Sequence, residues 1–315
     1  MTVLLARTAD RLYWGARYVE RAEDTARIVR AYHDLVVDFP SVDLLRWEPL
    51  AVLTGSVRLL LVPAEDPSGE RTVVHHLVAD GSNPSSIVSS VHAARENLRT
   101  TREVMPREAW QAVNQLSQYV DATASAAVER QLRDRFLLRV VEISRRLDGI
   151  LESTMTRSEA YRMLRLGRLV ERADMTTRVL GVAAAAILQE EAALGAEVQH
   201  DEIRWMNVLR SVSALQMYQR AVRGPIDGTD VVRFLVGHTA FPRSVRSCLE
   251  ESRDVLVFMP TPGLGLGEVD GALDLLAGAD SVITGAGLDA AMDGLQSAIA
   301  EVDRAIRDRY VDSAM

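Results

Sequence analysis

The chain has 315 residues, of which 36 are basic and 44 acidic, and its formal net charge is −8. All the basic residues are arginine, because the sequence contains no lysine, and this excludes Schiff-base chemistry and a P-loop of the Gly-Lys-Ser type. The acidic balance argues against non-specific nucleic-acid binding and against a polybasic membrane surface, so neither partner is expected.

Features at the level of the whole chain predict a cytoplasmic protein. Cys248 is the only cysteine, so an internal disulfide is excluded and a reducing compartment is expected. The short apolar start at Met1–Ala6 is followed at once by Arg7, which does not fit a signal peptide. No stretch approaches the roughly 20 apolar residues that a membrane-spanning helix needs.

Helical periodicity runs through nearly the whole chain and predicts an all-α fold, a large multi-helix bundle forming a single domain over residues 1–315. We expect long helices at residues 6–38, 85–104, 106–130, 132–153, 157–190, 201–221 and 287–310. Shorter helices are expected at 47–61, 229–237 and 242–257. Breaks are expected at 63–71, at 224–229 and in the glycine-rich run 259–287.

Two proline-containing segments are expected to start helices. In Asn83-Pro84-Ser85-Ser86, asparagine can cap free N–H groups and proline suits the first helical position. Phe241-Pro242-Arg243-Ser244 fits the same interpretation. At Thr72–Ala79 a strand competes with a helix, although a strand there would have no evident partner.

No metal and no cofactor is expected. His75 and His76 are adjacent, so they lack the spacing that places two ligands on one face, and the chain has no His-Glu-x-x-His pair. Gly285-Ala286-Gly287 fits a loose dinucleotide-binding pattern, but only one helix follows it, whereas a βαβ unit needs a further strand. A loop entering the last helix is the better interpretation.

The most informative feature is an internal repeat at an offset of 151 residues, which divides the chain into halves of about 1–150 and 151–315. The segment Arg17–Val29 returns as Arg168–Leu180 with seven identical positions. Each copy places small and apolar residues in steps of three and four, which predicts a packing seam between the two repeats that includes Gly15, Ala22 and Ala173. The opposite face of each helix is charged.

The repeated charged face has two interpretations. Arg and Glu pairs three and four residues apart are typical of a solvated surface, but repetition of residue identities favours an interior or cleft-lining layer. The residues of this layer that we single out are Arg17, Glu20, Arg21, Arg168, Glu171 and Arg172. Arg95 and Glu96 lie on an expected companion helix, and Arg243 and Arg246 are expected in a first helical turn, where free N–H groups bind anions.

These motifs resemble the alpha-E family, all-helical bacterial proteins named for their Glu-Arg motif. The resemblance rests on Leu12-Tyr13-Trp14, on both Arg-x-x-Glu-Arg copies, on Asn83–Ile87, on Ala94–Asn97 and on Phe241–Arg246, in family order from residue 7 to about 256. It implies a circularly permuted ATP-grasp protein as partner, with a transglutaminase-like protease as a further possible one. The oligomeric state is left open.

Two hypotheses follow from this resemblance. In the first, the chain is a non-catalytic helical partner of an ATP-grasp peptide or amide ligase, and the Arg-Glu layer binds the ligase or a peptide or anionic substrate. In the second, it is an enzyme of the same pathway, with a Glu general base in an Arg-lined cleft. The first is favoured, because no Ser-His, Cys-His or metal pattern supplies a nucleophile.

Overall fold

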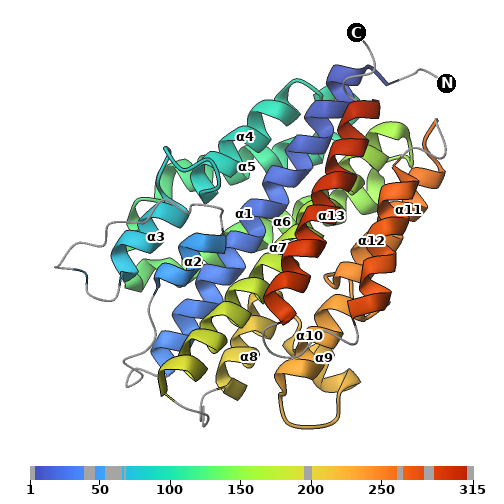
Figure 1. The fold of residues 1–315 in the computed structure, drawn as a ribbon. Helices are drawn as coiled ribbons and strands as arrows, with labels where there is room; N and C mark the ends of the chain where they lie inside the picture. Colours follow the sequence, from blue (N-terminus) through green and yellow to red (C-terminus); the bar gives the residue numbers. More distant parts are fainter. Residues whose placement is uncertain are drawn as a thin grey trace. The chain divides into compact units, whose positions relative to one another are not determined.

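A computed structural model describes residues 4–38, 47–53, 66, 69–194, 201–260, 265–279 and 287–310. Within these ranges the protein contains thirteen α-helices, two 3₁₀ helices and no strand, which confirms the predicted all-α fold (Figure 1). The chain divides into two compact units. The boundary lies between Arg168 and Leu169, inside one long helix, and Tyr310 belongs to the first unit.

The first unit is built on four long helices. They are α1 (Ala6–Asp38), α4 (Ile87–Arg99), α5 (Arg107–Thr123) and α6 (Arg130–Thr154). Both α1 and α5 pack against α4 and against α6, so the four helices form a closed bundle. The short helices α2 (Glu48–Leu53) and α3 (Glu70–Val78) are inserted between α1 and α4, while η1 (Arg102–Val104) and η2 (Ala126–Val128) lie in connections.

The central helix of this unit is α1, in which every residue from 22 to 29 is buried. It runs antiparallel to α6, since Arg30 Nε lies 2.6 Å from Asp134 Oδ1 and Arg145 Nε lies 3.8 Å from Glu23 Oε1. A Cβ atom on Gly15 would lie 2.7 Å from the side chain of Leu98 in α4. The expectation that the seam at Gly15 packs against the other repeat is therefore wrong, because this glycine allows a close approach to α4.

The second unit starts within α7 (Glu159–Leu194) and continues through six further helices. These are α8 (Asp201–Ser211), α9 (Leu215–Ala221), α10 (Gly228–Gly237), α11 (Val245–Val257), α12 (Leu266–Ala279) and α13 (Gly287–Tyr310). Helix α11 packs against α10 and α12, and α10 packs against α8. A Cβ atom on Gly181 in α7 would lie 3.7 Å from Met292, so α13 is the neighbour of α7 there.

The internal repeat extends beyond the charged helix. Each unit continues from its Arg-x-x-Glu-Arg helix through inserted short helices to a helix with a serine N-cap. The Ser86 hydroxyl accepts a hydrogen bond from the backbone N–H of Ser89, and Ser244 accepts one from Ser247, both at 3.1 Å. Since each cap lies two residues after a proline, the repeated unit contains both the charged helix and this capped helix.

Two local expectations around the first cap are resolved by the structure. Residues 70–78 form helix α3 rather than a strand, because Val73, Val74, Leu77 and Val78 share one buried helical face. Asn83 is not the N-cap of α4. Its side chain donates to the carbonyl oxygen of His76 at 2.9 Å and accepts from the N–H of Ser85 at 3.0 Å, which leaves the cap to Ser86.

Four expectations about where helices lie are also corrected. The glycine-rich run contains α12, whose Val269, Ala272 and Leu276 are buried at helical spacing. The helix expected at 201–221 is interrupted, because Ser213 adopts a left-handed conformation with φ of 54°. The helices expected at 85–104 and 106–130 end at residues 99 and 123. Residues 54–61 and 280–286 lie outside the described ranges.

None of the described helices combines the length and the apolar character that crossing a membrane requires.

Candidate functional site

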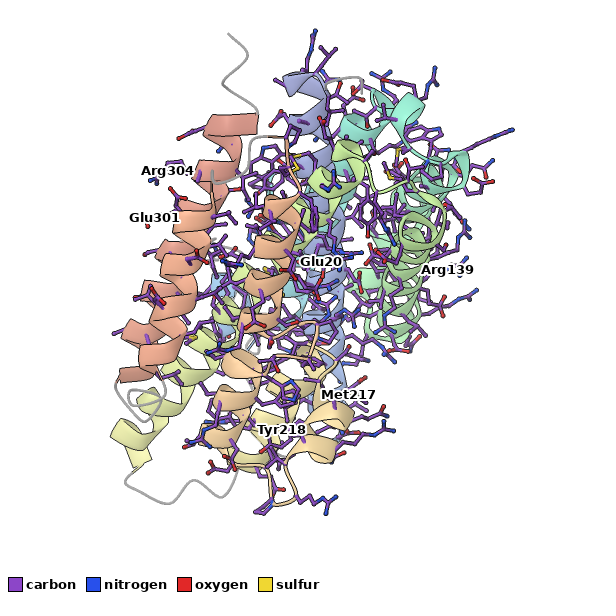
Figure 2. The ribbon with its side chains drawn as sticks, turned by 90° about the vertical axis from the view of Figure 1, so that its right-hand side faces the viewer. Glu20, Arg139, Met217, Tyr218, Glu301 and Arg304 are labelled. Carbon is purple, nitrogen blue, oxygen red and sulfur yellow. The ribbon has the colours of Figure 1, made fainter. Side chains whose placement is uncertain are left out.

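The repeated charged layer is largely withdrawn from solvent. Glu20 in α1 and Glu171 in α7 are each 1% exposed, and Arg17 and Arg27 are also buried. In Figure 2, Glu20 lies among the helices, whereas Arg139 projects outward from α6 and keeps 43% of its side chain exposed. Buried charges are costly unless they are paired, so this layer is not an ordinary solvated helix face.

The first unit contains a small cavity of about 30 Å³ beside Glu20. Its polar lining consists of Glu20, Asp148, Glu152, Tyr161, Arg165 and Arg168. Its apolar lining consists of Ala16, Val19, Leu98, Leu147, Leu151 and Leu164. Glu20 comes from the first copy of the motif and Arg168 from the second, so the fold brings residues of both copies to one cavity.

An ion pair holds Arg168 at this cavity. Its Nη1 atom lies 2.8 Å from Oδ1 of Asp148, which α6 supplies. The Nε atom of Arg168 is buried and has no hydrogen-bond acceptor among the described residues. An N–H group that is buried without an acceptor costs free energy.

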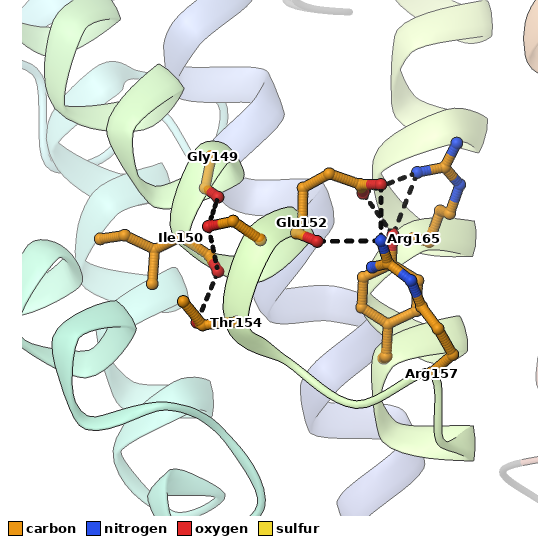
Figure 3. Close-up of polar contacts among 8 residues, drawn as sticks. Gly149, Ile150, Glu152, Thr154, Arg157 and Arg165 are labelled. Atoms are coloured by element: carbon orange, nitrogen blue, oxygen red, sulfur yellow. Dashed lines mark hydrogen bonds and ion pairs between the residues drawn. The ribbon is translucent and has the colours of Figure 1, made fainter.

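A second polar group lies where α6 ends and α7 begins (Figure 3). The Tyr161 hydroxyl donates a hydrogen bond to Glu152, and Arg165 Nη1 donates to the same carboxylate oxygen at 3.1 Å. Arg157 donates to the other oxygen at 2.8 Å. The hydrogen bond from Tyr161 and the nearby arginines lower the pKa of Glu152, so this carboxylate is ionised at neutral pH.

Three carboxylates of α1 and α6 form a candidate cation-binding group. One oxygen from each of Glu20, Glu23 and Asp148 lies within 4.8 Å of the others. However, Glu23 is ion-paired with Arg27, and Asp148 is paired with Arg168. A divalent cation would have to displace these guanidinium groups, so the geometry fits an ion-pair network better than a metal centre.

The remaining predicted residues of the first unit lie outside this cavity. Arg17 stacks over the Trp14 ring at 4.9 Å, and Arg21 lies 5.4 Å from the centre of the Tyr18 ring. Arg95 donates to Asn114 at 2.9 Å. Glu96 is exposed and pairs with Arg99, which is typical of a solvated helix surface.

In the second unit the motif lies beside the turn that precedes α11. Arg172 Nη1 donates to the carbonyl oxygen of Pro242 at 3.4 Å, and the Thr176 hydroxyl donates to that of Arg243 at 2.9 Å. Arg243 precedes the N-cap Ser244, so its expected position in the first turn is wrong, because the serine takes the cap. Arg246 does lie in the first turn, 3.6 Å from Glu250.

The sequence did not indicate four of the polar residues that line the cavity. Asp148, Glu152, Tyr161 and Arg165 lie outside the repeated segment, and they meet Glu20 only because α6 and the start of α7 fold onto α1. Tyr161, Arg165 and Arg168 are spaced by four and three residues, so a helical-face analysis of α7 could have grouped them. No sequence signal joins Asp148 to this face.

Comparison with known families shows a match that spans residues 4–311 and therefore nearly the whole chain. The matching family is described as a predicted alpha-helical domain with a conserved ER motif. No curated protein and no solved structure matches the sequence. The helical fold and the two Arg-x-x-Glu-Arg copies agree with that description, and the chain belongs to the Alpha-E family.

Proposed function

We propose that this protein is a non-catalytic helical partner of a peptide or amide ligase of the circularly permuted ATP-grasp type in the bacterial cytoplasm. In this role it binds the ligase or a peptide or anionic substrate through its Arg-Glu layer. The observation that carries the proposal is that Glu20 and Arg168, one from each copy of the motif, line one cavity. A transglutaminase-like protease is a further candidate partner.

The chemistry of the cavity supports binding rather than catalysis. Among the described residues that line it, Tyr161 carries the hydroxyl group, and this hydroxyl donates to Glu152. Burial and that hydrogen bond raise the pKa of Tyr161, so its phenolate is hard to form. Arg165 and Arg168 pair with carboxylates of the protein itself, which holds their guanidinium groups in place beside the cavity.

Binding to the ligase can be tested by co-purification. The tagged protein would be co-expressed with a circularly permuted ATP-grasp protein of the same organism, and the amount of ligase retained would be measured for Glu20→Gln and Arg168→Gln. Both variants are expected to lose the complex or its ATP-dependent ligation while remaining folded. Glu142→Gln is the control, because Glu142 is exposed and pairs only locally with Arg139 in the contacts described.

Two outcomes of this experiment would contradict the proposal. One is a complex that forms and ligates at wild-type level in both cavity variants. The other is amide formation by the purified Alpha-E protein alone, which would instead support an enzyme with a Glu general base. Melting temperatures of all variants separate a loss of function from a loss of fold.

A further inference from the structure

The short helix α3 has a polar face that lines a second pocket in the first unit. The opposite, apolar face of this helix is buried. The pocket has a volume of about 480 Å³, which lies in the usual range for sites that bind small molecules. Its lining comes from α3 and the two residues after it and from the segment around η2, and consists of Arg71, Thr72, His75, His76, Ala79, Asp80, Ser125 and Val128. None of these residues belongs to the Arg-Glu layer.

Three hydrogen-bond donors of this pocket are open to solvent. The Arg71 side chain is 69% exposed, and both His75 and Ser125 are exposed residues. Arg71 and His75 are four residues apart on α3, so their side chains lie on the same face of the helix. Among the described residues, neither the His75 ring nor the Ser125 hydroxyl has a hydrogen-bond partner. A ligand can therefore reach all three groups.

The ion pair of Arg71 leaves most of its donors available. Its Nη1 atom pairs with Glu129, whose side chain is 59% exposed and does not line the pocket. A guanidinium group carries five N–H donors in a planar fork, and an ion pair as exposed as this one contributes little to stability. A ligand can take the remaining N–H groups, or replace Glu129, at small cost.

The other polar side chains of the pocket are bonded to the protein itself. The Thr72 hydroxyl donates to Asp66 at 2.8 Å. One oxygen of Asp80 faces His76 Nδ1 at 3.2 Å, and the other accepts from the N–H and the hydroxyl of Ser82 at 2.8 and 2.6 Å. The described His, Cys, Asp and Glu side chains form no group of three at this pocket that could hold a metal ion. The groups left for a ligand are therefore a guanidinium, an imidazole and a hydroxyl.

This set of donors fits an oxygen anion, and the neighbouring residues favour one kind. Arginine forks bind both carboxylates and phosphates. Asp80 adds a negative charge to the wall, which repels a phosphate dianion about twice as strongly as a single carboxylate. Ala79 and Val128 supply apolar surface for the carbon atoms next to a carboxylate. We propose that this pocket binds a monocarboxylate with a short apolar body, held by Arg71, His75 and Ser125.

Pairs of acids and amides test this assignment, because the two members of a pair have similar shapes and differ in charge. N-acetylalanine, isobutyrate and their neutral amides would be titrated into the full-length protein at constant ionic strength by ligand-observed NMR. We expect each acid to bind at least about tenfold more tightly than its amide, since charge-assisted hydrogen bonds are the stronger ones. Tighter binding of N-acetylalanine would identify a peptide carboxyl terminus as the ligand, and tighter binding of isobutyrate would identify a free acid.

Inorganic phosphate is a further probe of the same pocket. It would be titrated at about pH 8, where it is mainly a dianion. The negative charge of Asp80 in the wall should make it bind more weakly than either acid.

Variants of the pocket then locate the binding. Arg71→Gln should weaken binding of the acids about tenfold and Ser125→Ala about threefold, because a charged and a neutral donor are removed. Glu129→Gln should instead tighten binding about threefold, because it releases Arg71 and removes a nearby negative charge. A loss of fold cannot produce such a gain. Arg99→Gln and His92→Gln are matched controls at exposed positions outside the pocket, and they should bind like wild type.

The carboxylate assignment is wrong if the amides bind as tightly as the acids, or if phosphate binds most tightly. It is also wrong if Arg71→Gln and Ser125→Ala both keep full affinity, or if Glu129→Gln fails to tighten binding. These results are separable from the proposed function. A ligase complex that depends on Glu20 and Arg168 would uphold that function even where the carboxylate assignment fails.

Discussion

A Cβ atom on Gly167 would lie 2.2 Å from the main-chain oxygen of Tyr13, so α7 and α1 touch backbone to backbone where the second motif begins. Gly167 immediately precedes Arg168 and therefore sets how closely this arginine approaches α1. The absence of a side chain at residue 167 is a condition for the shared cavity, because a backbone oxygen cannot move aside as a flexible side chain can.

We predict that Gly167→Ala destabilises the protein by about 1 to 3 kcal/mol, the usual cost of overpacking. Gly149→Ala is the matched control, since a Cβ atom there meets nothing within 4 Å and Gly149 is an exposed helical residue. The control should be neutral or stabilising by up to about 1 kcal/mol. Urea unfolding of both variants measures the difference, and equal midpoints would contradict the close contact.

The two serine caps should behave alike, because they occupy equivalent positions in the repeat. Ser86→Ala and Ser244→Ala each remove the acceptor for one helical N–H group, and each is expected to cost about 1 kcal/mol of unfolding free energy. Replacement by Asn or Asp should recover most of that loss in both units. A cap that can be removed without effect in one unit only would argue against the extended repeat.

The buried guanidinium of Arg133 ties the inserted helix α3 to α6. Arg133 is 1% exposed, donates to Glu70 at 2.7 Å and lies 5.3 Å from the centre of the Trp47 ring. Glu70→Gln removes the carboxylate that pairs with Arg133 and should lower the free energy of unfolding by about 3 to 5 kcal/mol. Glu129→Gln breaks the exposed pair with Arg71 and should cost about 0 to 1 kcal/mol. Denaturant unfolding measures the loss of stability in each variant. If Glu70→Gln loses as little as the control Glu129→Gln, the ion pair between Glu70 and Arg133 is not shielded from water.

His33 should make stability depend on pH. Burial and the neighbouring Arg133 lower its pKa below 6.5 in the folded protein. As the pH falls below about 6.5, the unfolded chain takes up a proton that the folded one resists, so the free energy of unfolding decreases until the folded pKa is reached. Between about pH 7.5 and pH 5.5, the free energy of unfolding should decrease less for His33→Gln than for wild type, as measured by denaturant unfolding. His75→Gln, at an exposed position, should keep the wild-type slope.

The spacing of apolar residues along the sequence predicted most helices, because the buried positions on one face of a helix repeat with the helical period. It failed where a single backbone conformation or a tertiary contact decides the outcome. The break at Ser213 depends on one positive φ angle, and α12 is helical because Val269, Ala272 and Leu276 find a packed surface despite flanking glycines. The repeat pointed to Glu20 and Arg168, whereas Asp148 and Glu152 joined them only through the packing of α6 on α1.

The most direct test of the proposed function is ATP-dependent ligation by the proposed ATP-grasp partner with and without this protein, followed by mass spectrometry of the amide product. We predict that wild type supports ligation, that Glu20→Gln does not, and that the variant still unfolds cooperatively on heating, as a folded protein does. Glu142→Gln should support ligation fully. If Glu20→Gln keeps wild-type stability, partner binding and ligation, the buried Arg-Glu layer is structural only and the proposed site is wrong.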